Sequence, residues 1–311
     1  MFADVVIEGG GIKAIGLIGA IHEAEKRGYE WKRLAGTSAG AIIASFLAAG
    51  YTAEELKKIM LEMNYKQFIR KKGILHLPVI GQISNLLRYS GIYCGDALEE
   101  WVWRKLLAKG VRTFQDLDKP VYIIASDITS GTLLKLPDDL IQFDIEPSTF
   151  EIAKAVRMSA SIPFYFQPVR LKTNDGTKNG NRYHYIVDGG ILSNFPVWIF
   201  DSEFYPKWPT FGFRLVSEKT GKPNKVKGPL SLGHALINTM MDAHDMLHLK
   251  EKDFVRTIMV NTLGTKTTEF DISDEQREKL YLSGVNSAKK FFNQWNFAQY
   301  ASTYRSKEIQ S

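Results

Sequence analysis

The chain has 311 residues, of which 44% are hydrophobic and 24% are charged. This composition is typical of a folded globular protein and excludes a disordered chain. The length accommodates one large α/β domain with or without an extension, and the single cysteine, Cys94, excludes an internal disulfide framework. The net charge of +6 gives only a weak preference for anionic partners.

The sequence has no stretch of about 18 consecutive apolar residues, so no membrane-spanning helix is expected. Residues 1–11 lack the basic and apolar regions of a secretory signal. We therefore expect a cytoplasmic protein that associates with membranes, if it does so, only peripherally and transiently.

The N-terminal segment alternates between strand and helix patterns. Residues 3–8 form a short apolar run before three glycines, which predicts a buried strand and a tight loop. A helical pattern follows over residues 12–27. A second short strand at 34–37 leads into a helix at 38–49 that is almost wholly apolar or small. This alternation predicts a parallel α/β sheet.

The same patterns predict further elements along the chain. Helices are expected over residues 52–63, 96–109 and 148–158. Strands are expected over residues 121–126 and 183–187. Ser148 is the expected N-cap of the third of these helices, with Glu151 at capping-box spacing.

Two segments depart from this regular pattern. Residues 66–93 mix basic and apolar side chains without periodicity, which fits either a surface insertion or a membrane-facing lid. The sequence pattern changes after about residue 205, so we place the domain boundary there. Residues 206–311 are expected to form a mainly helical C-terminal extension packed on the core.

The stretch from Gly36 to Gly40 reads G-T-S-A-G and matches the nucleophile elbow G-x-S-x-G, with Ser38 at its centre. The elbow requires a strand before the serine and a helix after it, and both are predicted here. Small flanking residues allow the turn, and the helix N-terminus favours negative charge next to the hydroxyl. The alternative is a small-residue turn in which Ser38 caps the helix.

Three glycines, Gly9, Gly10 and Gly11, lie at the first strand-to-helix junction. Successive glycines allow several backbone N–H groups to point at one spot, as in an oxyanion or phosphate cradle. Together with Ala14, Gly9 and Gly11 also satisfy the dinucleotide fingerprint G-x-G-x-x-G/A. That alternative lacks the acidic residue expected at the end of the second strand.

A serine nucleophile needs a base, and two kinds of base are available. Asp188 ends an apolar strand and is followed by Gly189 and Gly190, so its carboxylate is expected near the other loops. The alternative is a triad in the usual chain order of serine, acid and histidine, with Asp127 or Asp188 as the acid. Its histidine would come from a predicted helix, which carries His234, His244 and His248. His244 and His248 have near-zincin spacing but no evident third ligand, so no metal is expected.

These motifs occur in the order of the patatin-like phospholipase family, and residues 1–205 resemble that family. The segment from Ser159 to Pro163, S-A-S-I-P, is part of the resemblance. Ala14 and Glu8 depart from it, since the family commonly has glycine and aspartate at these positions. The resemblance implies a three-layer α/β/α fold with a mainly parallel central sheet.

The resemblance also implies a function and a set of site residues. Ser38 would be the nucleophile and Asp188 its base, without a histidine, metal or cofactor. The backbone N–H groups of the glycine loop, above all those of Gly10 and Gly11, would form the oxyanion hole together with that of Ala39. Lys13 stands at the family's basic position after the glycines.

We therefore expect a lipid acyl hydrolase of the phospholipase A or lysophospholipase type. Its partners would be a phospholipid or other acyl lipid and, transiently, a membrane surface; no nucleic-acid partner is expected, and the sequence does not indicate an oligomeric state. The alternatives are a Ser-His-Asp esterase or thioesterase and a non-enzymatic lipid-binding module. We interpret Phe164, Tyr165 and Phe166 as core residues, with an acyl channel as the alternative.

Overall fold

The structure is a computed structural model. It describes residues 1–63, 65–68, 91–173, 182–202, 205–216, 228, 235–236, 239–240, 250–265 and 272–304. Most of the segment predicted as an insertion or lid, residues 69–90, lies outside these ranges.

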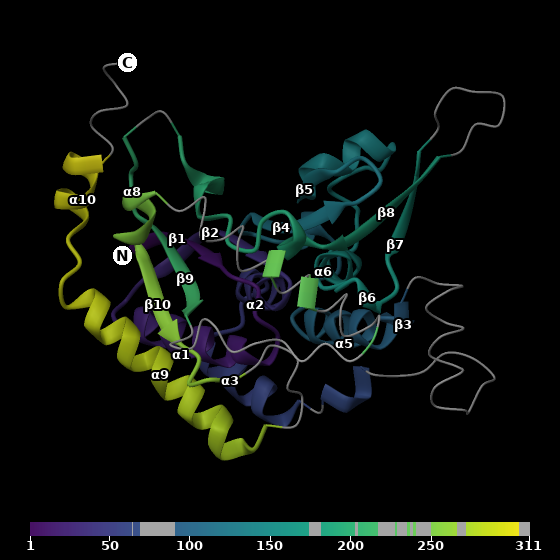
Figure 1. The fold of residues 1–311 in the computed structure, drawn as a ribbon. Helices are drawn as coiled ribbons and strands as arrows, with labels where there is room; N and C mark the ends of the chain where they lie inside the picture. The colour runs from purple at the N-terminus through teal and green to yellow at the C-terminus, as the bar shows by residue number, and fades with distance from the viewer. Residues whose placement is uncertain are drawn as a thin grey trace.

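A central, mainly parallel sheet organises the molecule (Figure 1). Its strand order is β10-β9-β1-β2-β4-β8-β7, and β5 pairs with β4 off this path. The strands are β1 (Phe2–Ile7), β2 (Glu30–Thr37), β4 (Val121–Asp127), β5 (Thr132–Leu136), β7 (Val169–Thr173), β8 (Arg182–Asp188), β9 (Thr210–Val216) and β10 (Thr257–Asn261). The pairs from β10 to β4 are parallel, whereas β5, β8 and β7 join antiparallel. A separate two-stranded sheet pairs β3 (Gly91–Tyr93) with β6 (Phe164–Phe166).

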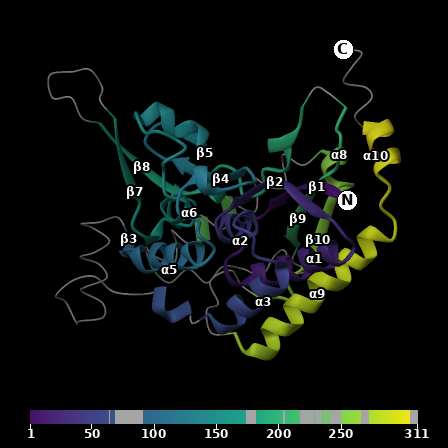
Figure 2. The same ribbon diagram turned by 180° about the vertical axis from the view of Figure 1, so that it is seen from behind.

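Helices cover one face of the central sheet (Figures 1 and 2). α1 and α9 lie against β9 and β10, α2 lies against β1, β2 and β4, and α6 lies against β4 and β8. Outside this layer, α3 packs on α1 and α5 packs on α6. The α-helices are α1 (Ile15–Lys26), α2 (Ala39–Ala48), α3 (Ala53–Glu62), α5 (Asp96–Leu107), α6 (Ile152–Ser159), α8 (Glu251–Phe254), α9 (Asp274–Phe292) and α10 (Phe297–Tyr304).

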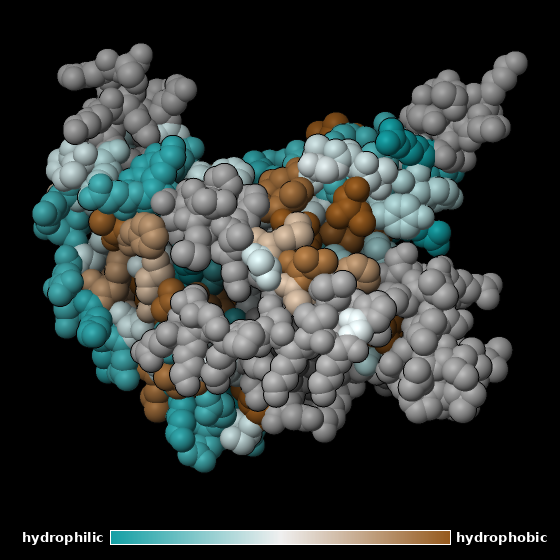
Figure 3. All heavy atoms as spheres, in the orientation of Figure 1, coloured by the Kyte–Doolittle hydropathy of each residue, from teal (hydrophilic) through white to brown (hydrophobic). Residues whose placement is uncertain are grey.

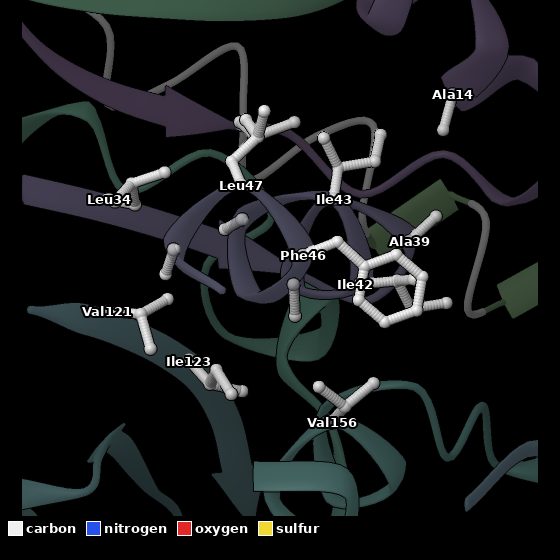
Figure 4. Packing of buried hydrophobic residues seen from close by; sticks show 14 of the residues in the cluster. Ala14, Leu34, Ala39, Ile42, Ile43, Phe46, Leu47, Val121, Ile123 and Val156 are labelled. Atoms are coloured by element: carbon white, nitrogen blue, oxygen red, sulfur yellow. The ribbon is translucent and has the colours of Figure 1, made fainter. Parts of the chain in front are cut away.

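The main hydrophobic core lies between the sheet and this helical layer. Strand residues of alternating position, such as Val5 and Ile7 of β1, are fully buried in it. Helix α2 lies at its centre, and all ten of its residues are buried. Figure 4 shows side chains of α2 close to Leu34 and Ile123 of the neighbouring strands. Burial on all sides explains why the sequence of α2 shows no polar face.

The opposite face of the sheet carries a thinner layer. Val6 of β1 and Ala35 of β2, which point away from the main core, pack with Phe195, Val197 and Phe200. Two short 3₁₀ helices, η5 (Gly189–Ile191) and η6 (Val197–Phe200), belong to the segment that crosses this face. The α/β fold with a mainly parallel central sheet, predicted from the sequence, is therefore confirmed.

Some local predictions need correction. The helix predicted over residues 148–158 begins at Ile152 with Glu151 as its N-cap residue, and Ser148 instead bonds to Glu146 within the preceding turn. The first predicted helix begins as a 3₁₀ turn, η1 (Gly11–Ala14), before α1. The segment expected to be a mainly helical extension also supplies two strands, β9 and β10, to the central sheet. The sheet therefore continues past residue 205.

Candidate active site

Ser38 stands between β2 and α2 in a strained backbone conformation. Its φ of 54° and ψ of −121° are unusual for a residue with a side chain. Gly36 and Gly40 flank it where the backbone is crowded: a Cβ on Gly36 would collide with the carbonyl of Gly40, and a Cβ on Gly40 with that of Ile7. The strand, strained turn and helix are those of a nucleophile elbow, as the G-x-S-x-G pattern predicted.

Asp188 reaches Ser38 because β2 and β8 approach each other along one edge of β4. β2 ends at Thr37, which pairs with Ile124, and β8 ends at Asp188, which pairs with the next residue, Ala125. β5 pairs with β4 over both stretches and so occupies the other edge. The last residue of β8 therefore meets the residue that follows β2.

The two side chains are directly hydrogen-bonded. Ser38 Oγ donates to Asp188 Oδ2 at 2.7 Å, across 150 residues of sequence. The other carboxylate oxygen, Oδ1, accepts the N–H of Gly190 at 2.8 Å. Ser38 is 7% exposed and Asp188 is 1% exposed, so the pair is shielded from bulk water.

Burial changes the acidity of Asp188. It raises the pKa of this carboxyl from 3.8 to about 6, while the hydrogen bonds from Ser38 and Gly190 oppose the shift. A carboxylate with a higher pKa is a stronger base, so burial makes Asp188 better suited to accept the serine proton.

The end of α6 and the residues after it hold both partners in place. Ser159 Oγ accepts the backbone N–H of Ser38 at 2.8 Å and donates to the carbonyl of Ile124 at 2.5 Å. The carbonyl of Ser161 accepts the backbone N–H of Asp188 at 3.0 Å. The S-A-S-I-P segment therefore ties Ser38 and Asp188 to one short piece of backbone.

The glycine loop lies against Ser38. A Cβ on Gly9 would come within 3.1 Å of the Ser38 Cβ and 3.2 Å of the Thr37 carbonyl. The N–H of Gly9 is already used, because it donates to the carbonyl of Asn194 at 3.3 Å. In the part of the chain that the structure describes, the N–H groups of Gly10, Gly11 and Ala39 donate no hydrogen bond.

Contacts that the sequence did not reveal fix this loop. The side-chain amide of Asn194 donates to the Gly9 carbonyl at 3.3 Å. Glu8 is 4% exposed and accepts hydrogen bonds from Arg214 Nε at 3.3 Å and from the backbone N–H of Leu215 at 2.5 Å. Lys13 closes the 3₁₀ turn, since its N–H donates to the Gly10 carbonyl at 3.3 Å. Strand β9 therefore supports the glycine loop directly.

Within the described ranges, no histidine is hydrogen-bonded to Ser38. His234, His244 and His248 lie outside these ranges. His184 bonds through Nδ1 to Asp127 Oδ2 at 2.6 Å, and the ring of His22 packs edge-on against Tyr281. Over the same ranges, no group of three or more histidine, cysteine or acidic side chains is arranged to hold a metal ion.

Apolar side chains are exposed near the site. Ile128 follows the carboxyl end of β4 and is 53% exposed, and Phe164 is 40% exposed at a φ of +66°. Figure 3 shows apolar residues on the surface near β4 and α6. The interpretation of Phe164 as a core residue is therefore wrong, because its ring faces solvent, whereas Phe166 is buried. None of the described helices combines the length and apolar composition that crossing a bilayer requires.

The chain is similar in sequence to known proteins. The sequence model of the patatin-like phospholipase family matches residues 5–201. The "Uncharacterized protein YqhO" of Bacillus subtilis (strain 168) is 39% identical over 300 residues, which cover 96% of this chain and 100% of YqhO. The "Probable lipid hydrolase 463L" of Invertebrate iridescent virus 6 is 24% identical over 209 residues, which cover 63% of this chain and 62% of that protein.

Among solved structures, VipD from Legionella pneumophila has the same arrangement of elements. It superposes with a TM-score of 0.56 at 18% sequence identity, and the match covers 94% of this chain and 66% of VipD. At this level of identity the similarity concerns the fold.

Proposed function

The chain belongs to the patatin-like phospholipase family and is a lipid hydrolase, and from this premise we propose that it cleaves acyl esters of phospholipids or related lipids with a Ser38–Asp188 dyad. The observation that carries the proposal is the 2.7 Å hydrogen bond from the Ser38 hydroxyl to the buried Asp188 carboxylate. The strained turn at Ser38 and the raised pKa of Asp188 support it.

Acylation begins with attack of Ser38 Oγ on the ester carbonyl carbon. Asp188 Oδ2 accepts the hydroxyl proton as the new C–O bond forms. The negative charge that develops on the carbonyl oxygen is stabilised by backbone N–H donors, for which we assign Gly10, Gly11 and Ala39. We leave out Gly9, because its N–H is bonded to Asn194.

Collapse of the tetrahedral intermediate breaks the bond to the alcohol. Asp188 returns its proton to the departing alkoxide, which leaves as a lysophospholipid or another alcohol, and the acyl group stays on Ser38. Water then attacks the acyl-enzyme while Asp188 accepts one of its protons. When the second intermediate collapses, Asp188 protonates Ser38 Oγ, and the fatty acid is released.

Labelling with a lipid-like fluorophosphonate tests the dyad. We expect one adduct, at Ser38, and no adduct in Ser38→Ala. Asp188→Asn should label and hydrolyse at least about 10³-fold more slowly, because the serine loses its base. Asp127→Asn is the matched control, since this carboxylate bonds to His184 and not to Ser38.

Two outcomes would support a different function. A triad enzyme would lose activity when His234, His244 or His248 is replaced, whereas the dyad predicts retained turnover in all three variants. A lipid-binding module would show no covalent labelling of the wild-type protein. Full activity of Ser38→Ala, or an adduct on another serine, would rule out our assignment.

We also propose that the protein works transiently at a membrane surface. The exposed apolar residues Ile128 and Phe164 lie near the strand ends and loops that carry the dyad, and such side chains partition into the lipid interface. Co-sedimentation with phospholipid vesicles tests this: the double variant Ile128→Ser/Phe164→Ser should bind less than wild type. Equal binding would contradict it.

A further inference from the structure

A cavity lies at the end of the sheet opposite to Ser38. It has a volume of about 220 Å³ and opens beside Thr210, the first residue of β9, whereas Ser38 follows the last residue of the parallel strand β2. Its lining includes Arg33, Phe200, Tyr205, Lys207, Trp208 and Arg256. The dyad mechanism uses none of them.

The lining of this cavity is positively charged. Arg33, Lys207 and Arg256 contribute cations, and none of the lining residues that the structure describes is acidic. Within the described part of the chain, Lys207 has no ion pair or hydrogen bond, and its side chain is exposed. A cation-lined cavity of this kind favours an anionic ligand.

Carboxylates hold the two arginines in fixed orientations. Arg33 donates through Nε and Nη2 to Asp4, at 3.1 and 2.6 Å. Arg256 donates through Nη1 and Nη2 to Asp201, at 2.6 and 3.0 Å. Such bidentate pairs fix the guanidinium planes before any ligand arrives, so less freedom is lost on binding.

Aromatic rings form the rest of the wall. Tyr205 is 49% exposed, and Trp208 is also part of the lining. The ring of Phe200 already carries the Arg33 guanidinium at 4.7 Å. Exposed aromatic faces beside cations suit a ligand that has both a planar ring and a negative charge.

We propose that this cavity binds a small phosphate monoester that carries an aromatic ring, such as a mononucleotide. Its phosphate lies against Lys207 and Arg33, and its ring lies against Tyr205 and Trp208. The volume is below the range of about 300–1,000 Å³ that is usual for drug-sized ligands, so the ligand is small or partly exposed.

Calorimetric titration of the full chain with AMP tests the proposal. We expect saturable binding with a Kd below about 1 mM. Glycerol 3-phosphate has the phosphate without a ring and adenosine has the ring without a phosphate, so each should bind at least about tenfold more weakly. No saturation with AMP, or equal affinity for glycerol 3-phosphate, would overturn the proposal.

Two variants locate the binding. Lys207→Ala should weaken AMP binding by about tenfold or more, and Tyr205→Ala should weaken binding of AMP but not of glycerol 3-phosphate. Both side chains are exposed, so the fold should tolerate their loss. The control is Lys172→Ala, which changes an exposed lysine on β7, the strand at the opposite edge of the sheet from β9 and β10. Wild-type affinity in Lys207→Ala, or an equal loss in Lys172→Ala, would show that AMP does not bind here.

Discussion

The Ser38 hydroxyl donates its hydrogen bond to Asp188, a carboxylate on which two effects compete. Burial raises its pKa to about 6, and the hydrogen bonds from Ser38 and Gly190 limit the rise. An exposed aspartate with a pKa near 3.9 would be a weaker base for a serine hydroxyl. Burial, which makes the charged form unfavourable, therefore makes Asp188 the stronger base.

The pH dependence of hydrolysis follows from this pKa. Asp188 must be ionised to accept the Ser38 proton, so kcat/KM should rise with pH through about 6 and level off above it. Initial rates on a soluble ester substrate over this pH range measure the profile. Asp127→Asn should leave the midpoint unchanged. A profile that is flat between about pH 4 and 9 would mean that Asp188 ionisation does not limit the reaction.

The stability of the folded state should also depend on the ionisation of Asp188, but stability should fall with rising pH where activity rises. The folded pKa of about 6 lies above the ordinary 3.8, so the folded state holds the proton more tightly and loses stability as pH rises through this window. At pH above 6 the ionised, buried Asp188 costs about 3 kcal/mol relative to pH below 4.

Asp188→Asn removes this cost. The variant should exceed wild type in free energy of unfolding by up to about 3 kcal/mol near pH 8, and the excess should vanish near pH 4. Urea denaturation at the two pH values measures the difference. A constant difference at both values would show that Asp188 does not titrate as described.

Local sequence patterns indicated the two residues of the proposed dyad unequally. A strand, a G-x-S-x-G turn and an apolar helix indicated Ser38, whereas Asp188 was preferred over the histidines as its base only through the resemblance to the family. No local signature marks Asn194, and the S-A-S-I-P segment did not show what Ser159 contacts; the roles of these residues arise from hydrogen bonds to Gly9 and Ser38. Such contacts join distant parts of the chain, so periodicity and spacing cannot reveal them.

The missed strands have a similar explanation. Residues 210–216 are mostly apolar, which fits a fully buried parallel strand, but a short apolar run does not by itself distinguish strand from helix. These residues form a strand because β9 pairs with β1, which lies at the other end of the sequence. The departure Glu8 is explained in the same way, since its longer side chain reaches the backbone of Leu215 on β9.

The close packing of the glycine loop predicts the effect of adding a side chain at Gly10. A Cβ on Gly10 would collide with the end of the Leu215 side chain, so Gly10→Ala should displace the loop and lower kcat by about 10²–10³-fold. Gly10→Ala/Leu215→Ala should recover much of this loss, because it removes the clash. In Gly189→Ala the new Cβ would meet the backbone carbonyl of Ile124, which no side-chain deletion relieves. A double variant no more active than Gly10→Ala would contradict this explanation.

The predicted domain of residues 1–205 should not fold alone. Its truncation removes β9, which pairs with β1, and with it the fully buried Phe211 and Phe213. It also removes α9, which packs on α1 where the backbones of Gly16 and Gly284 are in close contact. Thermal unfolding followed by circular dichroism should show no cooperative transition. A cooperative transition together with fluorophosphonate labelling at Ser38 would show that the catalytic domain ends at residue 205.

Phe164 offers a test of backbone strain beside the site. Its φ of +66° is unfavourable for any residue with a Cβ. Phe164→Gly should therefore be more stable than Phe164→Ala by about 1 kcal/mol, as both remove the ring but only glycine relieves the strain. Tyr183, exposed on β8 and without a positive φ, is the matched control, and there alanine should be the more stable. Urea midpoints of the four variants measure both differences, and the same order at both positions would mean that Phe164 is not strained.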